Sequence, residues 1–168
     1  MREKNEKVQA IDIKKLSLSD KFTLSVATLC GVGYTPLMPG TAACIVAVAV
    51  FWVFKDQAMF AVFTGIAILL SFMFCTRAEQ VYGQKDCKRI VVDDFSGMCL
   101  ALIFMPRDIT IVFIGFWLFR GFDMLKISPA DRVERLPGAR GIVGDDLVAG
   151  LYANVLLQLL KFAFKITS

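Results

Sequence analysis

The 168-residue chain contains no histidine, and this absence removes several kinds of active site at once. A Ser-His-Asp triad, a Cys-His pair and a histidine phosphatase all need an imidazole as base or nucleophile. Zinc sites rely on His and Cys ligands, and the five cysteines form no Cys-x-x-Cys pair. Neither zinc nor histidine-dependent hydrolysis is therefore expected, and the cysteines are interpreted as small buried hydrophobic residues.

Other motifs for phosphate chemistry and for targeting are also missing. No cysteine is followed by arginine six positions later, which excludes the cysteine-phosphatase loop, and no G-x-x-x-x-G-K-[ST] P-loop is present. The net charge is only +4, without a basic run interleaved with aromatic residues, so nucleic acid is not expected as a partner. Residues 1–21 are highly charged and lack the apolar core of a signal peptide.

Apolar residues, by contrast, are abundant. They make up 57 % of the chain, including 15 phenylalanines, and the mean hydropathy is +0.63. No charged residue occurs in 22–54 or in 57–76, whereas a membrane span needs only about 20 predominantly apolar residues. These runs favour a membrane protein over the alternative, a soluble helical bundle with an unusually large core.

The pattern of the apolar runs predicts an all-α fold, because no strand-like alternation persists anywhere. We expect a compact multi-helix bundle with broken or half-length helices, embedded in or associated with a membrane. Residues 1–21 would form a cytosolic tail or an interfacial helix, and 22–168 a single helical domain. The expected helices are 22–30, 41–54, 58–75, 95–105, 109–119 and 147–164.

Two prolines and a glycine interrupt the first uncharged run, in the segment Tyr-Thr-Pro-Leu-Met-Pro-Gly-Thr at 34–41. Proline lacks the N–H that a regular helix needs. Non-helical backbone at membrane depth must be buried in protein or line a wet cavity. The segment is therefore either part of a site or an ordinary turn between short helices, and both interpretations stay open.

Lysine and arginine concentrate in 1–21, 77–89 and 120–140, while the turns at 55–56 and 107–108 carry one each. Cytoplasmic loops of membrane proteins carry an excess of these residues. The three rich stretches, and with them the acidic clusters described next, are predicted to face the cytoplasm.

Two pairs of adjacent carboxylates, Asp93-Asp94 and Asp145-Asp146, each precede an apolar run. A carboxylate at the edge of hydrocarbon is costly unless it is paired, hydrated or bound to a metal. Clustered oxygen donors are the ligands that Mg²⁺ prefers, usually together with substrate phosphate. For Asp145-Asp146 alone, capping of a helix N-terminus is an alternative explanation.

A third charged cluster combines Arg120, Asp123 and Lys126 at spacings of three. That spacing places neighbouring members on adjoining parts of one helix face. The cluster could clamp a phosphate beside a metal carboxylate. For the triplet alone, an ion pair on a solvated face is the favoured alternative, because surface pairs of this kind are common.

Four segments in this order resemble the phosphatidylglycerophosphatase A family: Gly-Tyr-Thr-Pro-Leu-Met-Pro-Gly-Thr at 33–41, Val-Asp-Asp-Phe-Ser-Gly-Met at 92–98, Phe-Arg-Gly-Phe-Asp-Met-Leu-Lys at 119–126 and Gly-Ile-Val-Gly-Asp-Asp-Leu-Val-Ala-Gly at 141–150. The resemblance covers about 31–150. The family more often has Asp-Glu at 93–94, a Lys-Pro pair at 126–127 and Gly-Ser at 43–44. The resemblance implies an all-helical, Mg²⁺-dependent lipid phosphatase of the bacterial inner membrane, with its active site on the cytoplasmic face. Its substrate would be the anionic phospholipid phosphatidylglycerophosphate, cleaved to phosphatidylglycerol and phosphate.

On this hypothesis one or two Mg²⁺ ions are held by carboxylates, namely Asp93, Asp94, Asp123, Asp145 and Asp146. The predicted catalytic residues are Asp93, Asp94, Asp123 and Asp146. Arg120 and Lys126 would bind the phosphate oxygens. Asp94 would accept the proton of the attacking water, and Gly40 and Thr41 would present an N–H and a hydroxyl to the headgroup.

Two other classes of function remain open at this point. A small transporter or ion-binding membrane protein would also have broken helices and intramembrane carboxylates, but it would place the acids near mid-span rather than at helix entrances. A structural membrane subunit would show no dependence on metal. The sequence does not determine the oligomeric state or the number of metal ions.

Overall fold

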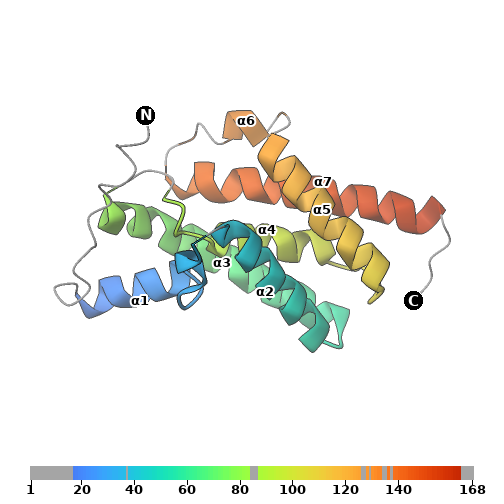
Figure 1. Cartoon of the computed structure of the whole chain (residues 1–168), viewed down its shortest axis with the longest axis horizontal. Coiled ribbons are helices and arrows are strands. Elements are labelled where there is room, and N and C mark those ends of the chain that lie inside the picture. Colours follow the sequence, from blue (N-terminus) through green and yellow to red (C-terminus); the bar gives the residue numbers. More distant parts are fainter. Residues whose placement is uncertain are drawn as a thin grey trace.

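A computed structural model describes residues 17–36, 38–83, 87–125, 128, 130–133, 136 and 138–163, with the backbone alone described at 131 and 132. Within these ranges every regular element is helical, which confirms the all-α prediction (Figure 1). The elements are α1 (Leu18–Ala27), the 3₁₀ helix η2 (Val32–Tyr34), α2 (Pro39–Val53), α3 (Gln57–Tyr82), α4 (Val92–Leu102), α5 (Ile109–Leu125), α6 (Ala130–Val133) and α7 (Ala139–Ala163).

The short helix α4 lies in the middle of the bundle, with α2 and α3 on one side and α5 and α7 on the other (Figure 1). Met98, Cys99 and Leu102 of α4 are completely buried. The α4–α7 contact is close because it lacks side chains at its centre: a Cβ on Gly150 would overlap the carbonyl oxygen of Gly97. The element that carries Asp93 and Asp94 is thus the core of the fold.

Side chains from neighbouring helices satisfy helix ends that would otherwise lack hydrogen-bond partners. The Ala139 N–H at the start of α7 donates to the Thr76 hydroxyl of α3 at 2.8 Å. At the C-terminal end of α4, the side-chain amide of Asn154 on α7 donates to the backbone carbonyls of Ala101 and Ile103 at 3.0 and 2.8 Å. These contacts fix the register of α7 against α3 and α4, which positions Asp146.

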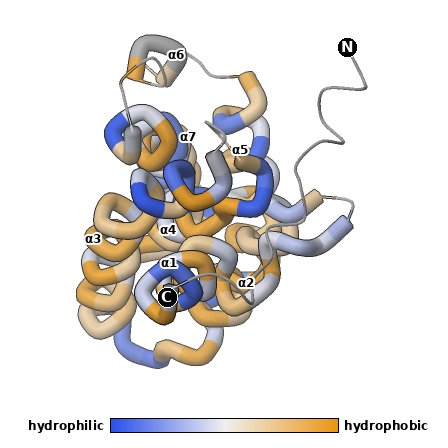
Figure 2. The backbone as a smooth tube through the Cα atoms, turned by 90° about the vertical axis from the view of Figure 1, so that its left-hand side faces the viewer, coloured by the Kyte–Doolittle hydropathy of each residue, from blue (hydrophilic) through white to orange (hydrophobic). Residues whose placement is uncertain are grey.

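Both α3 and α7 are long and apolar enough to cross a membrane. Only 28 % and 39 % of their most apolar windows are buried inside the protein, so most of that surface faces outward. In Figure 2 hydrophobic colour predominates in α3. Contiguous exposed apolar surface of this kind marks contact with a membrane or a partner, in agreement with the expected membrane-associated bundle.

Several predicted boundaries need correction. α1 begins at Leu18 rather than at 22, and α3 continues to Tyr82 instead of ending at 75. α5 continues to Leu125, so the segment from 120 onward starts as helix, not as irregular structure. α7 begins at Ala139, and no acidic residue lies in its first turn, so N-capping by Asp145-Asp146 was wrong.

The predicted interruption between α1 and α2 is present but shorter than expected, because the connection includes the 3₁₀ helix η2 and α2 already begins at Pro39. Gly31 adopts φ +105°, a left-handed conformation that favours glycine, and it precedes η2. Pro39 then occupies the first turn of α2, where its missing N–H leaves no hydrogen bond unmade. This segment brings the start of α2, with Gly40 and Thr41, against the start of α4.

Candidate active site

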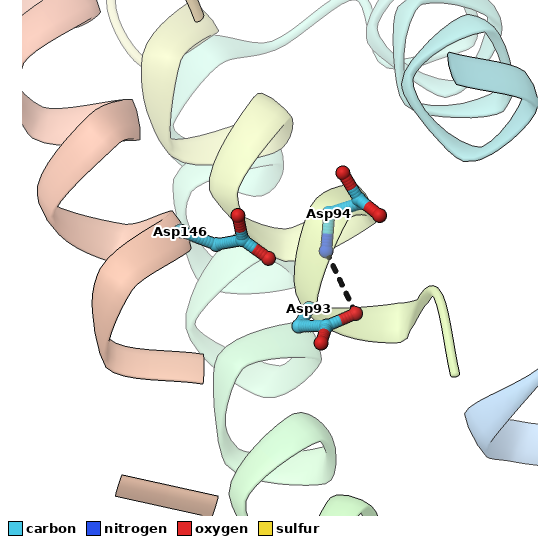
Figure 3. A group of neighbouring side chains, drawn as sticks. All are labelled: Asp93, Asp94 and Asp146. Atoms are coloured by element: carbon cyan, nitrogen blue, oxygen red, sulfur yellow. Dashed lines mark hydrogen bonds between the residues drawn. The ribbon is translucent and has the colours of Figure 1, made fainter. Parts of the chain in front are cut away.

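Three carboxylates from two helices converge at one end of α4. Asp93 and Asp94 lie in the first turn of α4, and Asp146 extends toward them from α7 (Figure 3). One oxygen from each lies within 4.8 Å of the others. Asp93 is 5 % exposed and Asp146 is 6 % exposed. Residues 53 positions apart in the sequence therefore form one buried acidic cluster, which we call the aspartate trio.

Local contacts hold the trio in place. The Asp94 N–H donates to the Asp93 carboxylate at 3.0 Å, and the Ser96 hydroxyl donates to the Asp93 carbonyl at 3.0 Å. The hydroxyl of Ser71 on α3 lies 3.2 Å from that of Ser96. On the opposite side, a Cβ on Gly97 would approach the Asp146 carbonyl to 2.8 Å. The glycine thus permits the close approach of α7.

Arg120 connects the trio to α5. Its Nη1 donates to an Asp94 oxygen at 2.6 Å and to an Asp123 oxygen at 2.7 Å. The Arg120 side chain is only 15 % exposed, and those of Asp94 and Asp123 are 17 % and 19 % exposed. The interpretation of Arg120 and Asp123 as an ion pair on a solvated face is therefore wrong, since the arginine bridges two helices in a largely buried position.

The first turn of α2 closes the site over Asp94. A Cβ on Gly40 would overlap the Asp94 carboxylate, so the Gly40 backbone lies directly against this acid. The next residue, Thr41, has a buried hydroxyl oxygen with no hydrogen-bond partner among the described residues. A buried hydroxyl without a partner costs free energy, and here it lies next to the residue that touches the trio. Gly40 thus lies against the site, and Thr41 is its neighbour in the first turn of α2.

The electrostatics of the site favour the binding of a cation. Burial raises the pKa of the Asp93 carboxyl well above its usual value, and the neighbouring Asp94 carboxylate raises this pKa further. Burial also raises the pKa of Asp94 to about 7, although the Arg120 guanidinium opposes this shift. One arginine thus faces several acids in a poorly solvated place, where carboxylates are paired or bind metals.

The donor set fits a hard divalent cation. All three members of the trio offer carboxylate oxygens, and Mg²⁺ is bound in proteins by one or two carboxylates together with substrate phosphate and water. Two of the three acids come from one helical turn and the third from a facing helix, so the set surrounds a common point from two sides. The residues present are therefore suitable for Mg²⁺.

The remaining predicted residues have different positions. Asp123 pairs with Arg120 and lies outside the trio. Asp145 adjoins the trio on α7, where its carboxylate accepts the Asp146 N–H at 3.1 Å. Lys126 lies outside the described residues. Sequence reasoning missed Ser71 and Ser96, although Ser96 belongs to the Asp-Asp-Phe-Ser-Gly segment and Ser71 is a polar residue within an uncharged span.

Curated relatives from bacteria match most of the chain. It is 31 % identical over 148 residues to "Phosphatidylglycerophosphatase A" of Escherichia coli K12, covering 85 % of each protein. It is 30 % identical over 156 residues to the protein of the same name from Haemophilus influenzae, covering 89 % of this chain and 94 % of the relative. A Bacteroides thetaiotaomicron protein named "Putative phosphatidylinositol-3-phosphatase" is 29 % identical over 149 residues, covering 82 % and 92 %.

No solved structure matches the chain. The family model described as Phosphatidylglycerophosphatase A matches residues 25–161, a range that includes the aspartate trio, Arg120 and the Gly40-Thr41 turn. Together with the relatives, this match shows that the protein is a phosphatase and belongs to the phosphatidylglycerophosphatase A family.

Proposed function

We propose that this protein hydrolyses the terminal phosphomonoester of phosphatidylglycerophosphate, releasing phosphatidylglycerol and inorganic phosphate. The observation that supports this most strongly is the convergence of Asp93, Asp94 and Asp146 into a buried acidic cluster that contacts the guanidinium of Arg120, a group suited to binding phosphate. We place the enzyme in the bacterial inner membrane with this site on the cytoplasmic face, because the segments richest in lysine and arginine are predicted to be cytoplasmic.

We propose Mg²⁺ as the cofactor, held by Asp93 and Asp146 with Asp94 completing the set, and with Asp123 and Asp145 close by for a second ion. When bound, the ion supplies charge neutralisation for the phosphate and lowers the pKa of a water molecule in its coordination shell. The trio supplies the oxygen ligands, and its burial strengthens the attraction between these carboxylates and a cation.

The other side chains bind the phosphate and move a proton. Arg120 exchanges its contact with Asp94 for the phosphate oxygens, as a planar two-point donor. Thr41 donates the hydroxyl that otherwise lacks a partner, and the backbone N–H of Gly40 lies beside it. Lys126 is retained as a predicted phosphate ligand. These donors hold the phosphate in line for attack and stabilise the charge that develops on its oxygens.

In the reaction a water oxygen forms a bond to phosphorus while the bond between phosphorus and the glycerol oxygen breaks. Asp94 is the proposed acceptor of the proton lost by water, because it is the most exposed member of the trio and already lies beside the arginine. The leaving glycerol oxygen takes up a proton as it departs. The acyl chains stay in the bilayer against the apolar surfaces of α3 and α7.

Two alternatives, a different lipid substrate and a transporter, can be tested by measuring phosphate release. The Bacteroides relative makes phosphatidylinositol 3-phosphate a second candidate substrate, since it too carries a phosphomonoester on a lipid headgroup. A transporter would use the carboxylates without releasing phosphate. The trio favours an enzyme, because two of its members lie in the first turn of α4 rather than in the middle of a span.

The test is phosphate release from each lipid by the purified protein in detergent, with Mg²⁺ and with EDTA. We expect Mg²⁺-dependent release from phosphatidylglycerophosphate, and its loss in Asp146→Asn. Release from neither lipid would contradict the proposal, and faster release from phosphatidylinositol 3-phosphate would replace the substrate while keeping the chemistry. Release that persists in EDTA would contradict the metal.

A further inference from the structure

A second cationic group lies near the trio and has no role in the mechanism above. Arg89, in the segment just before α4, places its guanidinium carbon 5.2 Å from the ring centre of Tyr34 and 6.0 Å from that of Tyr82. The two tyrosine hydroxyls are 3.1 Å apart, so the rings are tied to each other. A Cβ on Gly33 would overlap the Arg89 carbonyl, which shows that η2 rests directly on this segment.

Arg89 differs from Arg77 and Arg120 by its partners. Arg77 pairs with Asp20 and Arg120 pairs with Asp94. Within the part of the chain that the structure describes, which omits 84–86, no carboxylate pairs with Arg89. Stacking on an aromatic ring uses the face of a guanidinium and leaves its in-plane N–H groups free to bind an anion. We call Arg89, Tyr34 and Tyr82 the Arg89 cluster. This cluster lies at the protein surface, because Tyr34 is 44 % exposed.

Two short chain segments connect the Arg89 cluster to the residues around the trio. Arg89 precedes Asp93 by four residues, and four residues of extended chain span at most about 14 Å. Tyr34 precedes Gly40 by six residues, and the Gly40 backbone lies against Asp94. The Cα atoms of Arg89 and Asp93 are therefore at most about 14 Å apart, a separation that a two-phosphate headgroup and the Arg89 side chain can bridge together.

We propose that Arg89, supported by Tyr34 and Tyr82, binds the phosphodiester of a phospholipid headgroup while the trio acts on a phosphomonoester. This rests on the proposed function, in which the substrate carries both groups separated by a glycerol unit. The phosphodiester belongs either to the substrate itself or to a neighbouring phospholipid. A planar cation with two-point hydrogen bonding suits such an anion, and the tyrosine rings hold it in orientation.

The first experiment measures selectivity in micelles of an uncharged detergent, which contain no phosphodiester apart from the substrate. The readout is the ratio of kcat/KM for phosphatidylglycerophosphate to that for phosphatidic acid, which has a phosphomonoester but no phosphodiester. Arg89→Gln should lower this ratio at least about tenfold, as expected for loss of a hydrogen bond to a charged group. Lys88→Gln removes the same charge from an exposed neighbouring position and should change the ratio by less than about twofold.

The same assay separates the two sources of the phosphodiester. A fall of the ratio in pure detergent micelles assigns the Arg89 cluster to the substrate's own phosphodiester. If activity falls in Arg89→Gln only after phosphatidylglycerol is added to the micelles, and falls equally for both substrates, the ligand is a neighbouring lipid. Equal behaviour of Arg89→Gln and Lys88→Gln under both conditions would overturn the inference.

A binding measurement makes the inference independent of the proposed reaction. Titration calorimetry with dihexanoylphosphatidylglycerol, a phosphodiester without a phosphomonoester, should give a Kd about tenfold weaker for Arg89→Gln than for Lys88→Gln. Arg89→Lys keeps the charge without the planar donor and should fall between them, and melting temperatures show whether each variant is folded. If the wild-type protein binds this lipid through Arg89 but does not hydrolyse phosphatidylglycerophosphate, the proposed function fails and the inference stands. If the protein hydrolyses phosphatidylglycerophosphate but Arg89→Gln changes neither the kcat/KM ratio nor the Kd, the inference fails and the proposed function stands.

Discussion

The two ends of α4 each have an arginine in a partly buried position, and the two arginines have opposite kinds of partners. At the N-terminal end, Arg120 contacts two carboxylates, Asp94 and Asp123. Beyond the C-terminal end, Arg107 donates to the backbone carbonyl of Lys55 at 2.7 Å and its guanidinium lies 5.6 Å from the ring centre of Phe51. Arg107 ties one turn to another, whereas Arg120 lies among acids that exceed it in number.

This difference shows how to separate a structural charge from a functional one when both are buried. The contacts of Arg107 are to backbone and to an apolar ring, so they stabilise the fold in any state of the protein. The acids around Arg120 are costly without a further cation, since burial raises the pKa of Asp93 and Asp94. Folding alone does not explain such a cluster, so the N-terminal end of α4 is expected to govern activity and the other end stability.

The largest effect is expected from the buried acids of the trio. Asp93→Asn and Asp146→Asn should each reduce kcat by about 10²–10³-fold, because each removes a charge that the proposed mechanism uses to hold the ion at the reacting centre. The melting temperature should be kept, since the amide is close in shape and carries no charge to bury. Steady-state phosphate release and a thermal melt in detergent give the two readouts, and near-normal activity of both variants would rule out a shared site.

A metal titration gives the next largest effect. Mg²⁺ at about 100 times its Kd should stabilise the folded protein by about 2.7 kcal/mol through preferential binding to the native state. The shift in melting temperature should disappear with EDTA and in Asp146→Asn. If Asp146→Asn were stabilised as much as the wild-type protein, the ion would have to bind elsewhere.

At the other end of α4, Arg107→Gln should affect stability rather than catalysis. It removes a charge-assisted hydrogen bond, worth about 1.5–3 kcal/mol. The lower value is expected, because two other guanidinium nitrogens of Arg107 are buried without a partner among the described residues. Arg77→Gln, in an exposed ion pair with Asp20, is the matched control and should cost about 0–1 kcal/mol. A loss of kcat/KM per folded molecule in Arg107→Gln would break the division between the two ends.

The fold class was predictable because long uncharged runs leave few alternatives to helices. The boundaries were not, because they depend on tertiary contacts. Gly138 to Gly144 looks irregular in sequence, yet the Thr76 hydroxyl caps the Ala139 N–H and starts α7 there. Likewise, α3 continues past residue 76 because its backbone hydrogen bonds need no apolar side chains, and Arg77 finds a partner in Asp20 of α1.

For the candidate site, the sequence identified the acidic residues but not their arrangement. The residue types and the family resemblance pointed to five acids as metal ligands, but spacing alone did not show which of them converge. The structure separates them, since Asp93, Asp94 and Asp146 converge and Asp123 pairs with Arg120. That separation depends on how α5 and α7 are rotated against α4, and a contact between residues 26 positions apart leaves no local signal.

The smallest expected effect, on Arg120, tests the comparison most sharply. Arg120→Lys keeps the positive charge but not the planar donor that contacts both Asp94 and Asp123 through Nη1. As a purely structural cation it would be replaced at little cost to the rate. As a phosphate ligand its bonds strengthen while the phosphate transfers, so the rate suffers more than the fold. We therefore expect kcat/KM to fall at least about tenfold, equivalent to about 1.4 kcal/mol, with a nearly unchanged melting temperature in detergent. Unaltered kinetics in Arg120→Lys, alongside a lower melting temperature, would make Arg120 the same kind of structural tie as Arg107.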